Sequence, residues 1–298
     1  MTPLESGILA RRKQLRGLGE EEIVFVQKRL LSSLWVRMLR KRARRVVYDF
    51  DDAVFLSRSE SGVSASRSRR GRFAAIVKAA DHVIAANDYL AAAAREHTSE
   101  SRVSVLPIAV DLSRWPARRE WRREPGERIT IGWMGSPANH PYFSPLKPVL
   151  AELLGSNPAL QLKIVSDKPI EVDGASVHQK PFHEDEEVAD LHSFDVALAP
   201  YPDDDWTRGK SPGKLVAYMA SYLPVVGSDV TCVRRIIRNN VNGVLAESPG
   251  AWLLLVRRLS DSLDLRKTLG SAARATIEEG YDIRRLSIRY AELLRSLA

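Results

Sequence analysis

Cysteine is almost absent from this sequence of 298 residues, which contains only Cys232. A single cysteine cannot form a disulfide within the chain, so we expect a reducing compartment. It also argues against a structural zinc site, since no pair of the six histidines has the spacing of zinc ligands. No apolar run approaches the roughly 20 residues of a membrane span, and the charged first thirty residues contain no signal-peptide core. These absences predict a soluble, cytoplasmic protein that binds no metal.

The overall composition is that of a globular protein, with 44% hydrophobic and 28% charged residues, which excludes a disordered or fibrous chain. The length predicts about two domains. The charge is unevenly distributed, because residues 1–125 contain 25 Lys and Arg against 15 Asp and Glu, whereas residues 126–298 contain 20 against 22. A surface for an anionic partner is therefore expected in the first part of the chain.

Short apolar runs alternate with segments of helical periodicity along both halves of the sequence. The expected strands are 23–27, 46–50, 82–86, 102–106, 129–134, 160–165, 177–179, 196–200 and 225–227. The expected helices are 28–44, 72–80, 88–96, 142–154, 184–193, 212–222, 230–238, 249–260, 262–279 and 282–297. The Ser-, Arg- and Gly-rich stretch 57–71 is predicted to be a mobile loop. The alternation predicts an α/β fold with parallel sheets covered by helices.

A stretch with three prolines and little periodicity, residues 107–127, separates the two halves. We therefore predict two Rossmann-like domains, the first at 1–112 and the second at 128–280, joined by a linker at 113–127. A C-terminal helix at 281–298 is expected to pack back on the first domain. Ligands of such sheets bind beyond the carboxyl ends of the strands, which directs attention to the loops there.

The loop before the expected helix 212–222 has the features of an anion site. It carries Arg208, Lys210 and Lys214 among glycine, serine and proline residues. Free N–H groups at a helix start, with nearby cations, favour a diphosphate, although the segment lacks the pattern of a Walker loop. The alternative is that the segment is only a flexible turn.

The same segment resembles the donor-binding region of glycosyltransferase family 4, whose members have the two-domain GT-B architecture. The resemblance is carried by Arg208-Gly209-Lys210, Lys214, Tyr218-Met219-Ala220, Leu223-Pro224-Val225-Val226, Asn242-Gly243, Ile131-Gly132-Trp133-Met134-Gly135-Ser136-Pro137, Val47-Tyr48-Asp49-Phe50-Asp51-Asp52-Ala53, Asn87-Asp88-Tyr89-Leu90 and Pro107 to Leu112. No single motif decides the matter, but their order and spacing cover about residues 22–298.

The resemblance implies transfer of a sugar from a nucleotide-diphosphate sugar, UDP- or GDP-linked, to a glycan, lipid-linked or cell-surface acceptor. The C-terminal domain would hold the nucleotide and the N-terminal domain the acceptor, with retention of configuration and without a metal or other cofactor. It implies donor-binding roles for Gly135, Ser136, Arg208, Lys210, Lys214 and Tyr218.

Two departures from the family pattern keep a second reading open. The family's two donor-binding glutamates fall here at Gly209 and Ala217, so both carboxylates are missing. Residues 1–21 are too few for the elements that usually precede the first strand, so we expect an incomplete N-terminal domain. The alternative to an active enzyme is a non-catalytic homologue that binds a nucleotide or a partner protein.

The acidic residues after the strand 46–50 are the candidates on the acceptor side. Asp51 lies where many family members place a histidine, which suggests a base or an orienting group, and Asp49 and Asp52 flank it. Alternatively, these aspartates only cap the turn. A metal site is the less favoured reading. His140, in a ligand-facing loop, is a further acceptor-side candidate.

The expected helix at 28–45 has an apolar face surrounded by eight Lys and Arg residues. It is either a core helix with a solvated basic side or a docking surface for anionic lipid head groups. The second reading would place the protein at the inner face of the membrane. Binding of nucleic acid is not expected, because the sequence contains no recognised nucleic-acid module.

Overall fold

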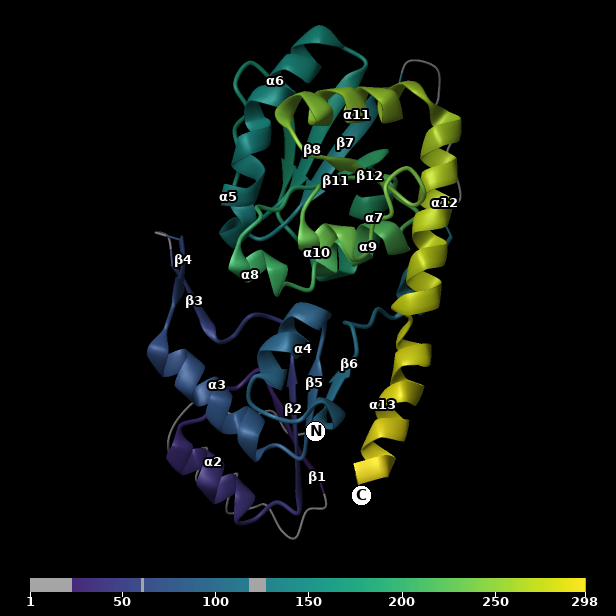
Figure 1. Ribbon diagram of the computed structural model, residues 1–298. Coiled ribbons are helices and arrows are strands. Elements are labelled where there is room, and N and C mark those ends of the chain that lie inside the picture. The colour runs from purple at the N-terminus through teal and green to yellow at the C-terminus, as the bar shows by residue number, and fades with distance from the viewer. Residues whose placement is uncertain (1–22, 60–61, 118–126, 298) are drawn as a thin grey trace. The chain divides into compact units, whose positions relative to one another are not determined.

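The structure is a computed structural model that describes residues 23–59, 62–117 and 127–297 (Figure 1). The chain forms two compact units. The first contains the described residues up to Ile108, the segment Asp204–Ser211 and the end of the chain from Leu286. The second contains Ala109–Asp203 and Pro212–Arg285. The segment Asp204–Ser211 thus lies in the sequence of the expected second domain but belongs to the first unit.

The first unit is built on a parallel sheet with the strand order β1-β2-β5-β6. These strands are β1 (Ile23–Gln27), β2 (Arg45–Phe50), β5 (His82–Ala85) and β6 (Val103–Val105). The helices of this unit are α2 (Ser33–Arg40), α3 (Arg67–Ala79), α4 (Asp88–Arg95), the short α8 (Asp205–Arg208) and most of α13 (Ile283–Leu297).

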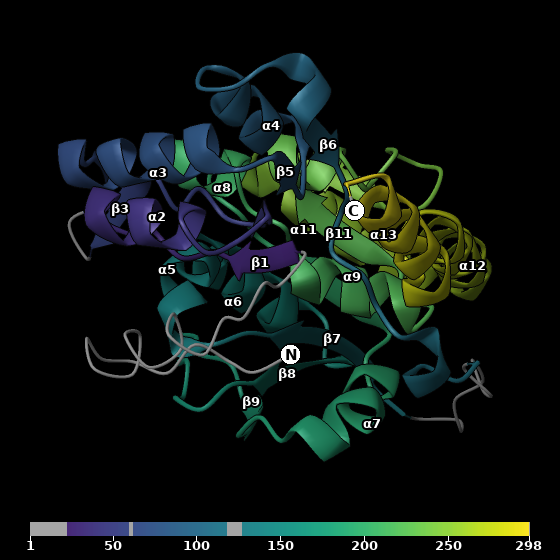
Figure 2. The same ribbon diagram turned by 90° about the horizontal axis from the view of Figure 1, so that it is seen from below.

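The alternation of side chains along β2 separates the two faces of this sheet. Tyr48 and Phe50 are fully buried in a core that α2, α3 and α4 complete. Val47 points to the other face, where Tyr290, Leu293, Leu294 and Leu297 of α13 pack against it. Figures 1 and 2 show α2 and α3 side by side on their face of the sheet. The end of the chain therefore completes the hydrophobic core of the first unit.

The second unit contains a parallel sheet with the order β12-β11-β10-β7-β8-β9. Its strands are β7 (Ile129–Met134), β8 (Leu160–Val165), β9 (Val177–Lys180), β10 (Val196–Ala199), β11 (Val225–Ser228) and β12 (Val244–Ala246). Because β7 lies between β8 and β10, the strand order reverses there. That reversal is the switch point at which open α/β sheets bind ligands.

Helices cover both faces of this second sheet (Figure 1). They are α5 (His140–Phe143), α6 (Lys147–Ser156), α7 (Glu187–His192), α9 (Gly213–Ala220), α10 (Thr231–Arg234), α11 (Pro249–Asp261) and α12 (Leu263–Gly280). Both α6 and α11 contribute apolar side chains to the main core, and α9 packs on β10, β11 and α12. The predicted α/β class with parallel sheets is confirmed.

Three sequence predictions were wrong in detail. The basic helix expected at 28–45 is only Ser33–Arg40, because Lys28 has a left-handed backbone (φ 55°) that ends the strand without starting a helix. The expected loop 57–71 contains an antiparallel hairpin, β3 (Leu56–Ser59) with β4 (Gly62–Ala65), and the start of α3. The helix expected at 230–238 is one turn, Thr231–Arg234, and β12 was not foreseen.

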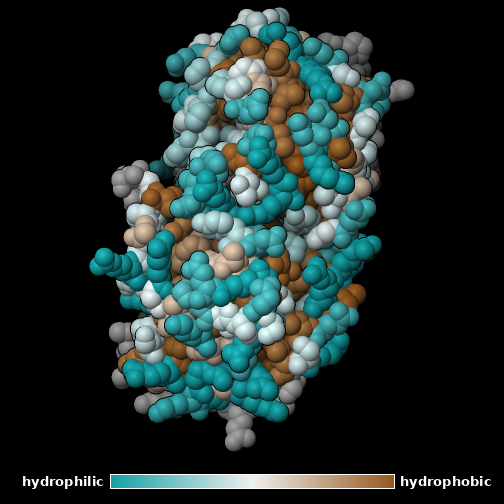
Figure 3. All heavy atoms as spheres, in the orientation of Figure 1, coloured by the Kyte–Doolittle hydropathy of each residue, from teal (hydrophilic) through white to brown (hydrophobic). Residues whose placement is uncertain are grey.

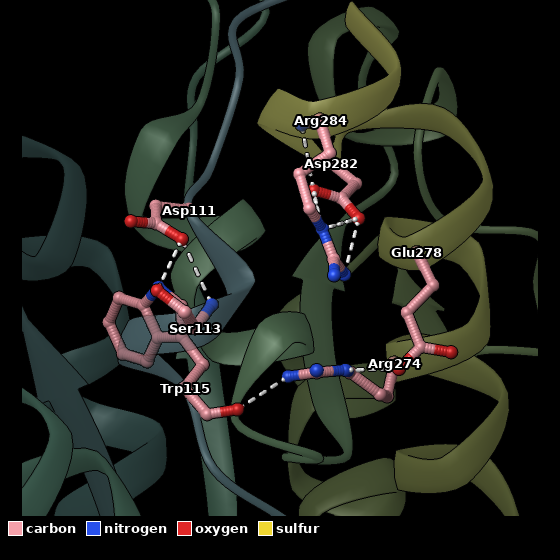
Figure 4. Close-up of polar contacts among 7 residues, drawn as sticks. All are labelled: Asp111, Ser113, Trp115, Arg274, Glu278, Asp282 and Arg284. Atoms are coloured by element: carbon pink, nitrogen blue, oxygen red, sulfur yellow. Dashed lines mark hydrogen bonds and ion pairs between the residues drawn. The ribbon is translucent and has the colours of Figure 1, made fainter.

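Hydrogen bonds join the first residues of the second unit to residues of its last two helices and the turn between them. The N–H of Val110 donates to the carbonyl of Tyr281 at 2.8 Å, and the N–H of Ile283 donates to the carbonyl of Val110 at 3.0 Å. Figure 4 shows the buried Arg274 guanidinium donating to the carbonyl of Trp115 at 2.9 Å. The first residues of the expected linker 113–127 are thus packed in the second unit, while residues 118–126 lie outside the described residues.

Candidate functional site

A cavity lies at the switch point of the second sheet, beyond the carboxyl ends of β7 and β10. Its lining comes from these two strands, from the segment after β7 and from α9. The lining residues are Trp133, Met134, Asn139, Tyr142, Leu198, Ala199, Pro200, Tyr201, Lys214 and Tyr218. The lining mixes apolar and polar side chains, and Lys214 is the charged residue in it.

The turn after β7 is shaped by close packing around Gly135. A Cβ atom on Gly135 would lie 2.4 Å from the indole ring of Trp133, so the turn requires glycine. Tyr218, on α9, is hydrogen-bonded to the same end of β7. Its hydroxyl accepts a hydrogen bond from the N–H of Met134 at 2.8 Å and donates to the carbonyl of Met134 at 3.0 Å. Burial raises the pKa of Tyr218 well above its usual value. Its hydroxyl therefore stays neutral and has a structural role.

Lys214 is the cation of this cavity, and α7 holds it in place. Its Nζ donates to Oε1 of Glu187 at 2.7 Å and lies 4.3 Å from the centre of the Phe182 ring. The α7 helix is itself anchored through the buried Asp190, which accepts hydrogen bonds from Lys163 at 2.8 Å and from Lys180 at 2.9 Å. The position of Lys214 is therefore fixed by a chain of ion pairs that runs back to β8 and β9.

The predicted donor residues are divided between the two units. Lys214 and Tyr218 line the cavity, and Gly135 and Ser136 directly follow its Met134. Arg208 and Lys210 belong to the segment of the first unit, where Arg208 donates to Asp205 at 3.1 Å. Sequence reasoning overlooked Glu187 and Phe182, because their place beside Lys214 depends on tertiary packing.

Gly209 is enclosed by the first unit. The carbonyl of Gly209 accepts a hydrogen bond of 3.1 Å from the buried side-chain amide of Asn87. A Cβ atom at this position would lie 2.8 Å from the Cβ of Ala53 and 3.0 Å from Leu90. This packing leaves no room for the glutamate that the family pattern suggested at position 209.

The carboxyl edge of the first sheet brings the predicted acceptor-side aspartates together with Lys28. Nζ of Lys28 lies 2.5 Å from Asp51 and 3.4 Å from Asp52. The backbone N–H of Lys28 donates a hydrogen bond to the backbone carbonyl of Asp49 at 2.8 Å. A left-handed backbone at a lysine is uncommon and strained, and such strain gathers at functional sites. Lys28 was predicted as part of a helix and not at this site, because its left-handed backbone is visible only in the fold.

Asp49 is more deeply placed than its two neighbours, with 9% of its surface exposed. Its carboxylate accepts a hydrogen bond from Gln27 at 3.2 Å and a longer one from the Tyr290 hydroxyl of α13 at 3.4 Å. Burial raises the pKa of Asp49, which these hydrogen bonds and the charge of Lys28 partly oppose. This aspartate is thus a titratable group at the sheet edge, held by the first strand and the last helix.

His140 begins α5 in the second unit, whereas the three aspartates belong to the first unit. Its Nε2 lies 2.9 Å from the hydroxyl of Ser166, which follows β8. Burial, and then the charges of Lys168 and Lys147, lower the pKa of His140, so the imidazole is neutral at pH 7.

No group of three His, Cys, Asp or Glu side chains among the described residues is arranged to hold a metal ion. Within the same residues, no helix combines the length and the apolar character that crossing a membrane requires.

Known proteins were compared with this chain by sequence and by structure. No curated protein sequence matches it. Residues 132–262 match the family described as "Glycosyl transferases group 1". The matched segment is under half of the chain and includes β7, the switch-point cavity and α9.

Several solved structures share the fold at low sequence identity. Sucrose-phosphate synthase from Thermosynechococcus elongatus aligns with a TM-score of 0.69 and 15% identity, over 92% of this chain and 73% of that one. HepE from Anabaena, solved in complex with UDP and glucose, gives 0.70 and 16%, over 97% and 82%. A glycosyltransferase from Rickettsia africae gives 0.71 and 13%, over 100% and 84%. These neighbours are GT-B glycosyltransferases, and the likeness supports the predicted fold class.

Proposed function

We propose that the protein is a glycosyltransferase that moves a sugar from a nucleotide-diphosphate sugar, UDP- or GDP-linked, to a glycan or lipid-linked acceptor. The observation that carries the proposal is the switch-point cavity with Lys214, which lies inside the segment that matches the group 1 family. The UDP bound to the structurally similar HepE is consistent with a nucleotide donor.

In this proposal the second unit stabilises the leaving diphosphate. Breaking the glycosidic bond leaves negative charge on the phosphate oxygens, and fixed cations and N–H groups can stabilise that charge without a metal ion. Lys214 supplies the cation, and the first turn of α9 supplies N–H groups with the positive end of the helix dipole. Ser136 stands beside the phosphates after the Gly135 turn. Retention of the anomeric configuration remains part of the proposal.

The acceptor belongs, in this proposal, to the carboxyl edge of the first sheet. Asp51 orients or deprotonates the acceptor hydroxyl, and Lys28 holds its carboxylate. Asp49 and Asp52 accept hydrogen bonds from further hydroxyls. A row of carboxylates beside one lysine is suited to a polyhydroxylated ligand, since each carboxylate can accept several hydroxyl hydrogen bonds.

We further propose that the basic side of the first unit rests on an anionic membrane surface. The exposed cations of α2, α3 and the turn after α2 include Arg37, Arg40, Lys41, Arg67, Arg70, Arg72 and Lys78. Leu34 of α2 is 57% exposed among them. Figure 3 shows a mainly hydrophilic surface with small apolar areas on this part of the molecule. Flotation with anionic but not with neutral vesicles would support this, and equal flotation with both would contradict it.

Calorimetry with UDP and GDP, followed by assays of donor hydrolysis and sugar transfer, tests the main proposal. We expect binding of one nucleotide in the micromolar range or tighter and release of that nucleotide from its sugar donor. Absence of binding by both nucleotides would contradict the proposal.

The second candidate is a non-catalytic homologue, favoured by the enclosed Gly209, which leaves no room for a carboxylate at that position. Tight nucleotide binding without donor hydrolysis or transfer, with a panel of acceptors that includes lipid-linked ones, would favour this candidate.

A further inference from the structure

A short segment of the first unit is joined at both ends to the lining of the switch-point cavity. This segment, the strap Asp204–Ser211, follows β10 and precedes α9 in the sequence, but it belongs to the first unit. Two residues separate it from Tyr201 on one side and from Lys214 on the other, and both Tyr201 and Lys214 line the cavity. Because three peptide steps span at most about 11 Å, the strap limits where these two residues can lie. The proposed function assigns the strap no role.

Two residues hold the strap on the first unit. The side chain of Trp206 packs against the main hydrophobic core of that unit. The carbonyl of Gly209 accepts the hydrogen bond from the buried Asn87, whose side-chain oxygen in turn accepts one of 3.1 Å from the N–H of Leu90 in α4. The position of the strap is therefore set by the core of the first unit and by the N-terminal cap of one of its helices.

The strap has an internal structure of its own. Asp204 and Thr207 form a capping box around α8, in which the Asp204 carboxylate accepts a hydrogen bond from the N–H of Thr207 at 2.7 Å and the Thr207 hydroxyl accepts one from the N–H of Asp204 at 3.1 Å. Pro202 and Pro212 flank the strap and restrict the connecting backbone. A displacement of the strap from the first unit is therefore passed on to its two ends.

One feature of the docked strap is unfavourable. The indole nitrogen of Trp206 is buried, and no described residue accepts a hydrogen bond from it. A buried donor without a partner costs free energy, because it has lost its hydrogen bond to water. Docking of the strap is thus a balance of opposing contributions, and such a balance can respond to a ligand.

We propose that the strap is a conformational link, in which its docking on the first unit and ligand binding in the switch-point cavity stabilise each other. A docked strap restricts the two neighbouring parts of the lining, so less conformational entropy is lost when a ligand binds. By linkage, a bound ligand favours the docked strap to the same extent. The ion pair of Lys214 with Glu187 remains the main support of this residue, so the strap has the smaller effect. The inference rests on the proposed function only in taking a nucleotide as the ligand.

Gly209→Ala tests the link in the full chain. The backbone at Gly209 (φ −84°) suits alanine, so the added Cβ acts through its clash with Ala53, 2.8 Å away. Hydrogen exchange should become faster in the strap and also in the lining, at residues 199–201 and 213–218, and a second change, Ala53→Gly, should reverse most of both effects. Gly155→Ala, whose Cβ meets nothing within 4 Å, is the control. Faster exchange confined to the strap would overturn the proposal.

Asn87→Ser tests the same contact from the other side. It keeps the cap of α4, because a serine hydroxyl also accepts a hydrogen bond from an N–H of the first turn, but it removes the amide that donates to Gly209. The affinity for UDP, measured by calorimetry, should fall about threefold to tenfold in Asn87→Ser and in Gly209→Ala, the scale of ordering one or two side chains. UDP should also slow exchange of the strap in the native chain.

The outcomes separate this inference from the proposed function. Unchanged affinity for UDP in both variants would overturn the link. If the native chain binds neither UDP nor GDP, the proposed function fails, and the spread of faster exchange from the strap to the lining still decides the inference.

Discussion

The two parallel sheets of this protein end in opposite chemistry at their carboxyl edges. In the second unit the edge is formed by a glycine turn, the start of a helix and Lys214, which together suit an anion. In the first unit the edge is formed by Asp49, Asp51 and Asp52 around a strained Lys28. Parallel strands dictate that ligands bind at these edges, but the few residues after each strand decide which ligand is bound.

The difference extends to how each edge is held. Lys214 is fixed through α7 by the ion pairs of Asp190 with β8 and β9, so the proposed donor side depends on its own sheet. Asp49 is fixed in part by Tyr290 from the last helix, so the proposed acceptor side depends on the far end of the chain. Truncation after α12 would therefore disturb the first unit and its aspartates more than the switch-point cavity.

The largest effect is expected from Gly132→Ala, which tests whether the second sheet is as tightly packed as the site requires. A Cβ atom on Gly132 would lie 2.0 Å from the Phe194 ring, so the variant should lose about 3 kcal/mol of unfolding free energy. Gly155→Ala is the matched control, because its Cβ would meet nothing within 4 Å and the helix should gain about 0.5–1 kcal/mol. Urea unfolding measures both, and equal stability of the two variants would contradict the packing argument.

Asp51→Asn tests the proposed acceptor side alone. If Asp51 is the orienting group or base, turnover should fall about 100-fold or more, while the affinity for the nucleotide stays unchanged. Asp173→Asn, at an exposed position of the second unit, is the control. Steady-state rates and calorimetry separate the two quantities. Normal turnover would remove Asp51 from the mechanism, and a parallel loss of nucleotide affinity would remove the distinction between the two edges.

Lys214→Ala tests the proposed donor side alone. Loss of a charge-assisted contact should weaken diphosphate binding by roughly 1–3 kcal/mol. Glu187→Gln should act in the opposite direction, because it removes a carboxylate that competes with the diphosphate for Lys214 at 2.7 Å. A gain of about 0.5–1 kcal/mol is expected for this half-buried pair. Calorimetry with UDP measures both variants, and unchanged affinity in Lys214→Ala would exclude Lys214 from the site.

Much of the fold could be predicted from the sequence because strands of parallel sheets are buried on both faces and appear as short apolar runs. The strand at 129–134 and the one at 160–165 were predicted to the residue. The helix predicted at 28–44 is too long. Its apolar spacing includes residues next to Lys28, but the left-handed backbone of Lys28 prevents a helix from starting there. The hairpin Leu56–Ala65 was not predicted, because a serine- and arginine-rich composition carries no information about pairing between strands.

The candidate site was harder to predict than the fold. Local sequence identified Lys214, but not that Glu187, 27 positions earlier, would be its ion-pair partner. The segment that carries Arg208 and Lys210 was assigned to the donor side by its place in the sequence. Its grouping with the first unit depends on tertiary contacts, such as that between Asn87 and Gly209, which no local pattern contains.

The smallest predicted effect is a contrast in pH dependence between the two units. Burial raises the pKa of Asp49, so its contribution to stability is present in acid and is lost as pH rises through the folded-state pKa. A hydrogen bond from Arg284 lowers the pKa of Asp282, so its contribution is present above the usual carboxyl pKa and is lost as pH falls. Figure 4 shows the hydrogen bonds between the Arg284 side chain and this second carboxylate.

Two isosteric variants sharpen this contrast. Asp49→Asn should stabilise the first unit at neutral pH, because it removes a buried charge, and the gain should disappear in acid. Asp282→Asn should destabilise the second unit at neutral pH, and the loss should disappear in acid. Each effect is expected to be about 1 kcal/mol or less. Urea unfolding at several pH values gives the free energies, and hydrogen exchange assigns them to a unit. If both variants shift stability in the same direction at neutral pH, the two carboxylates do not differ as the directions of their pKa shifts indicate.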